Sequence, residues 1–99
     1  MAATTPISQQ PLFVACYDIS DNRERRRLDK LLCGFGFRTQ KSVFECHLGK
    51  SQKQQLVAAV ERLALCSGQL RLYRVYADVG AQAIGQPVKA DLTTYAFTV

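Results

Sequence analysis

The chain lacks any long apolar run. No stretch approaches the roughly 20 apolar residues that a helix needs to cross a bilayer. The first six residues, Met1-Ala2-Ala3-Thr4-Thr5-Pro6, also lack the basic end and apolar core of a secretory signal peptide. We therefore expect a cytoplasmic protein with no membrane partner.

The sequence also lacks the spacing of a zinc site. Its four cysteines, Cys16, Cys33, Cys46 and Cys66, include no close Cys-x-x-Cys pair, and the cytosol disfavours disulfides. Three of them lie in or beside apolar segments, where a free cysteine behaves as a small hydrophobic residue. His47 is the only histidine, and a lone imidazole is more often structural or exposed than catalytic. We expect structural thiols rather than metal ligands.

Acidic residues are outnumbered by basic ones. Thirteen Lys and Arg stand against eight Asp and Glu, which gives a formal net charge of +5. Such an excess favours a polyanionic partner and carries no information about the fold. With 99 residues and 47% apolar content, the chain suits one small domain, for which a homodimer would bury further surface.

The periodicity predicts an α+β protein with the order βαββαβ, the ferredoxin-like arrangement. We expect strands over residues 12–18, 37–40, 42–48 and 69–76, so that the domain covers residues 12–76. Residues 1–11 are polar and aperiodic and are expected to form a disordered N-terminal extension. Residues 77–91 have the composition of a loop. Residues 93–99 favour an additional C-terminal strand, which we expect to pair with the sheet edge of the partner in a homodimer.

Two helices are expected between these strands, each with a recognisable start. Asp21 with Glu24, and Ser51 with Gln54, both follow the capping-box pattern. Gly68 suits the left-handed cap that ends the second helix. Apolar residues at helical spacing define two core-facing stripes: Leu28, Leu31, Leu32 and Phe35 in the first helix, and Leu56, Val60 and Leu63 in the second.

A cluster of cations lies on the first predicted helix, away from its apolar stripe. Its members, which follow one another at helical spacing, are Arg23, Arg26, Arg27 and Lys30. A phosphate backbone would relieve their mutual repulsion and release condensed counterions. A solvated helix surface explains the same pattern equally well.

Asp18 is the candidate catalytic residue. It ends the apolar run of the first strand, so its carboxylate would be held rigidly with its oxygens toward solvent. Mg²⁺ accepts one or two carboxylates together with waters and a substrate phosphate, and such an ion lowers the pKa of a water nucleophile. Two Asp18 residues across a dimer axis would make a shared site. The alternative is that Asp18 is a turn or capping acid, and this interpretation is favoured when the residue is considered by itself.

Gly34-Phe35-Gly36-Phe37 matches the centre of the aromatic consensus of RNA-recognition motifs, a module with the same element order that stacks bases on its sheet. The consensus belongs on a strand, whereas here it lies at the end of the first helix, with Phe35 in the apolar stripe. We interpret the match as accidental. A plain RNA-binding module remains an alternative function.

Three segments together resemble the family of CRISPR-associated protein two, the small subunit of the spacer-acquisition machinery. They are Tyr17-Asp18-Ile19-Ser20-Asp21, the Arg25 and Arg27 pair before Leu31-Leu32, and Phe37-Arg38-Thr39-Gln40-Lys41-Ser42-Val43-Phe44-Glu45. They occur in the order of the family and at close to its spacing. The resemblance covers residues 12–76.

The resemblance implies a ferredoxin-like homodimer and a Mg²⁺- or Mn²⁺-dependent endonuclease that cleaves single-stranded RNA or double-stranded DNA. Asp18 matches the metal-binding aspartate of the family, and Tyr17 adjoins it. Four further residues match positions linked to activity: Arg25, Arg27, Arg38 and Phe44. The resemblance also implies a non-catalytic role in CRISPR adaptation, in which the dimer bridges two dimers of the integrase subunit, CRISPR-associated protein one.

Overall fold

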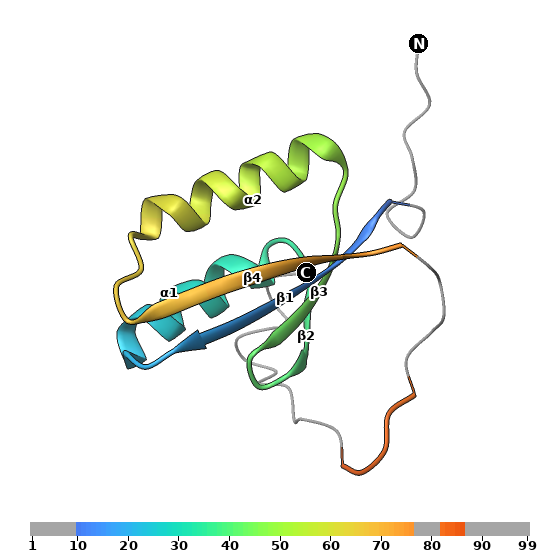
Figure 1. The fold of residues 1–99 in the computed structure, drawn as a ribbon, viewed down its shortest axis with the longest axis horizontal. Helices are drawn as coiled ribbons and strands as arrows, with labels where there is room; N and C mark the ends of the chain where they lie inside the picture. The colour runs from blue at the N-terminus through green and yellow to red at the C-terminus, as the bar shows by residue number, and fades with distance from the viewer. Residues whose placement is uncertain (1–9, 77–81, 87–99) are drawn as a thin grey trace.

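Four strands and two helices follow one another in the computed structural model, which describes residues 10–76 and 82–86 (Figure 1). In chain order they are β1 (Leu12–Ile19), α1 (Asn22–Cys33), β2 (Phe37–Gln40), β3 (Val43–His47), α2 (Lys50–Leu63) and β4 (Gly68–Val75). Each strand therefore begins and ends within one residue of the range that the sequence predicts.

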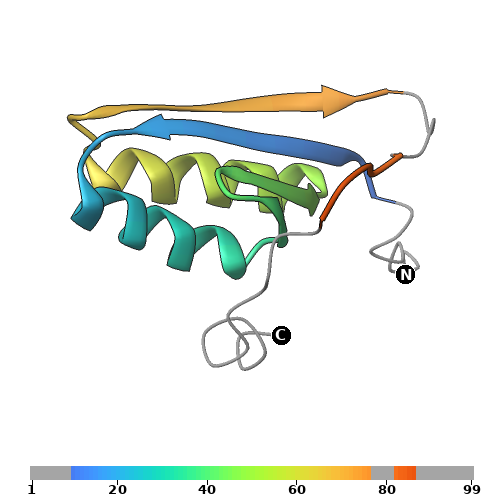
Figure 2. The ribbon, with the colours of Figure 1, turned by 90° about the horizontal axis from the view of Figure 1, so that it is seen from below.

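The strands form one sheet in the order β2-β3-β1-β4, with β1 in the interior. All three neighbouring pairs are antiparallel. Both helices pack on the same side of this sheet, so the described domain has two layers (Figure 2). This arrangement confirms the expected ferredoxin-like α+β fold.

Alternation along β1 separates the two sides of the sheet. The residues that face the helices are buried, with exposed fractions of 7% or less: Phe13, Ala15, Tyr17 and Ile19. Leu12, Val14, Cys16 and Asp18 point to the other side, because successive side chains of a strand alternate. We call that second side the open face, since neither described helix covers it.

The core lies between the sheet and the helices. Its largest fully buried side chains come from both layers: Phe44 and Cys46 of β3, Leu28 and Leu32 of α1, Leu56 of α2, and Leu48. Both predicted apolar stripes therefore face the core, and Phe35 packs against it as expected. None of the four cysteines, all of which the structure describes, forms a disulfide. Burial raises the pKa of the Cys46 thiol to about 11, so this thiol stays protonated at neutral pH.

The ends of α2 differ from the prediction. The helix begins at Lys50, and its cap is Gly49, whose backbone N–H donates to the Gln52 side chain at 3.0 Å. The capping pattern read at Ser51 therefore lies two residues too late. The helix ends at Leu63, and its C-cap is Ala64, which adopts the left-handed conformation itself with φ of 51°. Gly68, the expected cap, instead opens β4.

Two residues that the sequence pattern assigns to the leader contact the end of β3 and the residue that follows it. The Leu48 amide donates to the Pro11 carbonyl at 2.9 Å, and the His47 ring lies 3.2 Å from the Gln10 carbonyl. The remainder of the leader (residues 1–9) and the expected C-terminal strand (residues 93–99) lie outside the described residues. No helix in the described ranges is long and apolar enough to span a membrane.

Candidate nucleic-acid and metal site

Asp18 lies one residue before the end of β1. Its side chain is exposed on the open face, and its strand neighbour in β4 is Gln69. The Asp18 carboxylate makes no hydrogen bond or ion pair with any other described residue. The backbone of an interior strand therefore holds a carboxylate whose oxygens are available to a ligand.

Hydrogen bonds from the loop before β4 fix the backbone just after Asp18. The Ser67 carbonyl accepts the Ser20 amide at 3.1 Å, and the Ser67 hydroxyl accepts the Asp21 amide at 3.0 Å. Gly68 lies so close to β1 that a Cβ atom on it would be 1.8 Å from the Asp18 carbonyl oxygen. This contact requires glycine at position 68, which explains its presence at the start of a strand.

Glu24 joins α1 to the same loop. Its carboxylate accepts the amides of Cys66 at 2.9 Å and Ser67 at 3.0 Å, and the Ser67 hydroxyl as well. The Ser67 hydroxyl and these amides lower the pKa of the Glu24 carboxyl. Asp21 does cap α1 by accepting the Glu24 amide at 2.8 Å. The capping box is only half formed, because Glu24 bonds the loop instead of the Asp21 amide.

The predicted cationic face of α1 is present. Its side chains, which we call the basic ridge, are all exposed: Arg23, Arg26, Arg27 and Lys30. None of the four forms an ion pair within residues 10–76 and 82–86. Solvent ions or an anionic partner would therefore relieve their mutual repulsion.

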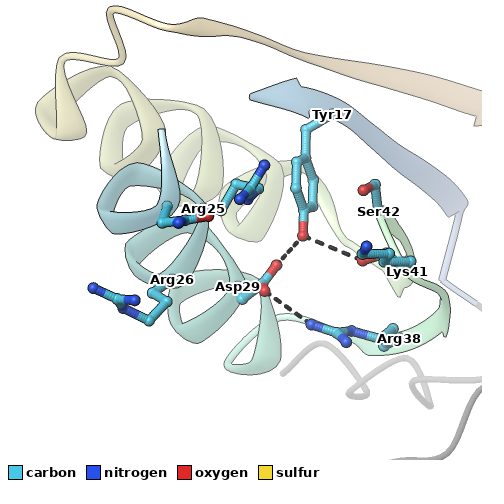
Figure 3. Close-up of a pocket in the computed structure, with 8 residues that line it drawn as sticks. Tyr17, Arg25, Arg26, Asp29, Arg38, Lys41 and Ser42 are labelled. Atoms are coloured by element: carbon cyan, nitrogen blue, oxygen red, sulfur yellow. Dashed lines mark hydrogen bonds and ion pairs between the residues drawn. The ribbon is translucent and has the colours of Figure 1, made fainter. Parts of the chain in front are cut away.

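A pocket of about 180 Å³ opens on the helix side of the sheet, between α1 and the β2–β3 hairpin (Figure 3). We call it the helix-side pocket; its lining residues are Tyr17, Asn22, Arg25, Arg26, Asp29, Arg38, Lys41 and Ser42. Four of them are cations and only Asp29 is an acid. No sequence pattern indicates that these residues meet, because separate elements supply them.

Asp29 organises the inner part of this pocket. It accepts the Tyr17 hydroxyl and forms an ion pair with Arg38 at 2.8 Å (Figure 3). Burial and the neighbouring Asp29 carboxylate raise the pKa of Tyr17, so the phenol stays protonated and continues to donate. Arg38 also lies over the Phe44 ring, with its Cζ 5.8 Å from the ring centroid. These contacts hold the Arg38 guanidinium against the pocket wall.

The family model for CRISPR associated protein Cas2 matches residues 12–80. The chain belongs to the Cas2 family. This match confirms the resemblance seen in the sequence, and its extent covers every described strand and helix.

Individual relatives agree with this assignment. The chain is 49% identical over 59 residues to the CRISPR-associated endoribonuclease Cas2 of Mycobacterium tuberculosis, a match that covers 60% of this chain and 52% of that protein. It is 37% identical over 75 residues to the CRISPR-associated endonuclease Cas2 2 of Thermus thermophilus, which covers 75% of this chain and 83% of that protein. The chain thus spans about half the length of the first of these relatives.

A solved structure shows the same fold. The crystal structure of the hypothetical protein TT1823 from Thermus thermophilus superposes with a TM-score of 0.69 at 34% identity. That match covers 80% of this chain and 99% of the other.

The structure separates the residues that the sequence resemblance predicts to act together. Asp18 is on the open face, whereas Arg25 and Arg38 line the helix-side pocket. Phe44 has an exposed fraction of 0%, so it can affect a site only by positioning its neighbours. Arg27 stands on the basic ridge. Within one chain, therefore, Asp18 and Arg38 lie on opposite sides of the sheet.

The only metal donor of the predicted set is Asp18. No three His, Cys, Asp or Glu side chains come together in the described ranges as a metal-binding group. A Mg²⁺ ion that keeps most of its waters needs only one or two carboxylates, and the Gln69 amide oxygen on the neighbouring strand is a suitable additional ligand. The donors at this strand end thus fit a hydrated hard cation.

Proposed function

We propose that this protein is a subunit of the CRISPR adaptation machinery that binds nucleic acid and cleaves its phosphodiester bonds with Mg²⁺ or Mn²⁺. The observation that carries this proposal is the exposed carboxylate of Asp18, which has no partner among residues 10–76 and 82–86, at the rigid end of an interior strand. Membership of the Cas2 family supports the same chemistry, since two relatives bear the names endoribonuclease and endonuclease.

Asp18 would hold the metal, and the basic ridge would bind the backbone of RNA or DNA. A bound cation would polarise the phosphate and lower the pKa of a water molecule. The cations of the basic ridge offset phosphate charge without reading base sequence, so the same surface accepts either nucleic acid. Arg25, Arg27 and Arg38 would contribute positive charge from outside the open face.

A homodimer would complete the metal site. The open face carries apolar, half-buried residues beside Asp18, including Val14, Cys16 and Val43. Apolar surface of this kind favours association with a second sheet. We propose that two copies meet there, aided by the strand that the sequence predicts over residues 93–99, so that their Asp18 carboxylates share one ion. We place this dimer in the cytoplasm.

A second candidate function is a non-catalytic scaffold that bridges dimers of the integrase subunit, CRISPR-associated protein one. The observation that favours it is the separation of Asp18 from Arg25 and Arg38 by the sheet. In such a scaffold the basic ridge binds the incoming DNA, and the Asp18 carboxylate performs no chemistry.

The test compares wild type with Asp18→Asn, which keeps the shape of the side chain and removes its charge. Both proteins are assayed on single-stranded RNA and duplex DNA with Mg²⁺, with Mn²⁺ and with EDTA. Glu61→Gln serves as the matched control, because Glu61 is an exposed acid on α2. With either metal ion, we expect wild type and the control to cleave, and the cleavage rate of Asp18→Asn to be lower by at least about a hundredfold. In EDTA we expect no cleavage by any of the three proteins.

Equal cleavage by wild type and Asp18→Asn would rule out the proposed metal site. A measurement of spacer acquisition in cells distinguishes the scaffold from the nuclease. A scaffold supports acquisition with Asp18→Asn as well as with wild type, whereas an essential nuclease does not.

A further inference from the structure

The helix-side pocket has the charge of an anion-binding site. Four cations line it and one acid, Asp29, opposes them. That acid is already compensated, because it accepts the Tyr17 hydroxyl and pairs with Arg38. The Lys41 ammonium and the Arg26 guanidinium make no hydrogen bond or ion pair with another described residue. Positive charge therefore remains available to a ligand.

The pocket differs in shape from the basic ridge. The ridge is a row of exposed side chains along a helix, a surface that can follow a continuous backbone. The pocket is a half-open hollow of about 180 Å³, with the buried Tyr17 and Asp29 on its inner side (Figure 3). An internal phosphodiester continues in two directions, whereas a terminal phosphate continues in one, so the end of a strand can enter such a hollow more deeply than a continuous backbone that passes its mouth.

Charge favours the same ligand. A terminal phosphate monoester carries a charge near −2 at neutral pH and offers three acceptor oxygens, whereas an internal diester carries a single charge. The excess of cations over acids in the pocket matches the monoester better. Asn22 and Ser42 add polar groups to its rim, and Arg25 keeps guanidinium donors beyond the one given to the Ile19 carbonyl at 3.0 Å.

Arg26 connects the two surfaces. It belongs to the basic ridge and also lines the pocket. A strand that lies along the ridge therefore reaches the pocket without leaving positively charged surface. Because the pocket and Asp18 are on opposite sides of the sheet, the phosphate held in the pocket is not the one attacked at Asp18.

We propose that the helix-side pocket binds the terminal phosphate of a nucleic-acid strand, with Arg25, Arg26 and Lys41 as its cationic ligands. This inference rests on the proposed function only in that the chain must bind nucleic acid. It does not require the chain to cleave it.

The test measures binding in EDTA by fluorescence anisotropy, so that no cleavage intervenes. The probes are one short single-stranded DNA and one RNA, each internally labelled and prepared with a 5′-phosphate, with a 3′-phosphate, or with neither. We expect wild type to bind one phosphorylated form about five- to tenfold more tightly than the unphosphorylated form, as a charge-assisted contact implies. Lys41→Ala should reduce this preference to about twofold or less.

Lys50→Ala is the matched control, because Lys50 is also an exposed lysine and lies at the start of α2. The control should keep the preference of wild type. Equal binding of all three ends by wild type, or an unchanged preference in Lys41→Ala, overturns the inference while leaving nucleic-acid binding intact. Displacement of the phosphorylated strand by adenosine monophosphate at equal concentration would show that the pocket binds a free nucleotide. That result would also overturn the inference. If wild type binds none of the probes, the proposed function itself is wrong.

Discussion

The basic ridge allows a quantitative prediction about salt dependence. Arg23 and Lys30 are seven residues apart on α1, which corresponds to about 10 Å along the helix. Phosphates of one DNA strand are spaced by about 3.4 Å along the axis, so the ridge spans about three intervals and can meet about four phosphates, one for each cation. Replacing Arg26 and Arg27 by alanine removes two of the four cations. The slope of log Kobs against log salt should therefore become shallower by about 1.8 for duplex DNA and about 1.4 for a single strand.

Anisotropy titrations over a range of NaCl concentrations measure this slope. The matched control is the double variant Lys50→Ala with Arg62→Ala, two exposed cations of α2 whose removal lowers the net charge equally. We expect the control to keep a slope close to that of wild type. If both double variants show the same slope, the effect belongs to net charge, and α1 is not the contact surface.

Two further predictions concern stability. Tyr17→Phe should lower the free energy of unfolding in urea by about 1–2 kcal/mol at neutral pH, because the bond to the Asp29 carboxylate is lost. Since the pKa of Tyr17 is raised in the fold, wild type should also lose stability as the pH rises above the ordinary value of 10.0, and the variant should not; parallel alkaline curves would contradict this. Glu24→Gln should weaken the bonds to Ser67. Because folding lowers the pKa of Glu24, the advantage of wild type should be present above the ordinary value of 4.5 and should vanish as the pH falls through the folded pKa. A difference that persists in acid would exclude this cause.

The order of the elements could be predicted because each carries a strong local signal. The apolar run that begins at Leu12 identifies an interior strand, and the leucines of α1 recur at helical spacing. The start of α2 could not be read as reliably. Gly49 has no capping side chain, so the helix relies on Gln52 for the bond, and the nearby serine offered a more familiar pattern.

The site was only partly predictable for a different reason. Exposure of Asp18 and of the basic ridge follows from periodicity within one element. The helix-side pocket depends on how α1 meets the β2–β3 hairpin, and no local pattern records that Asp29 lies beside Arg38. Likewise, the sequence pattern marks Glu24 as a local capping residue. Its actual partners, Cys66 and Ser67, are 42 and 43 positions away along the chain.

The alternation of side chains in β1 has a consequence for how this strand can change. Tyr17 and Asp18 are adjacent in the chain, yet one faces the helices and the other the open face. Inserting or deleting a single residue earlier in the strand would exchange them. The acid would then be forced among hydrocarbons and the phenol into water, so the length of this segment should be under as much constraint as the identity of its residues.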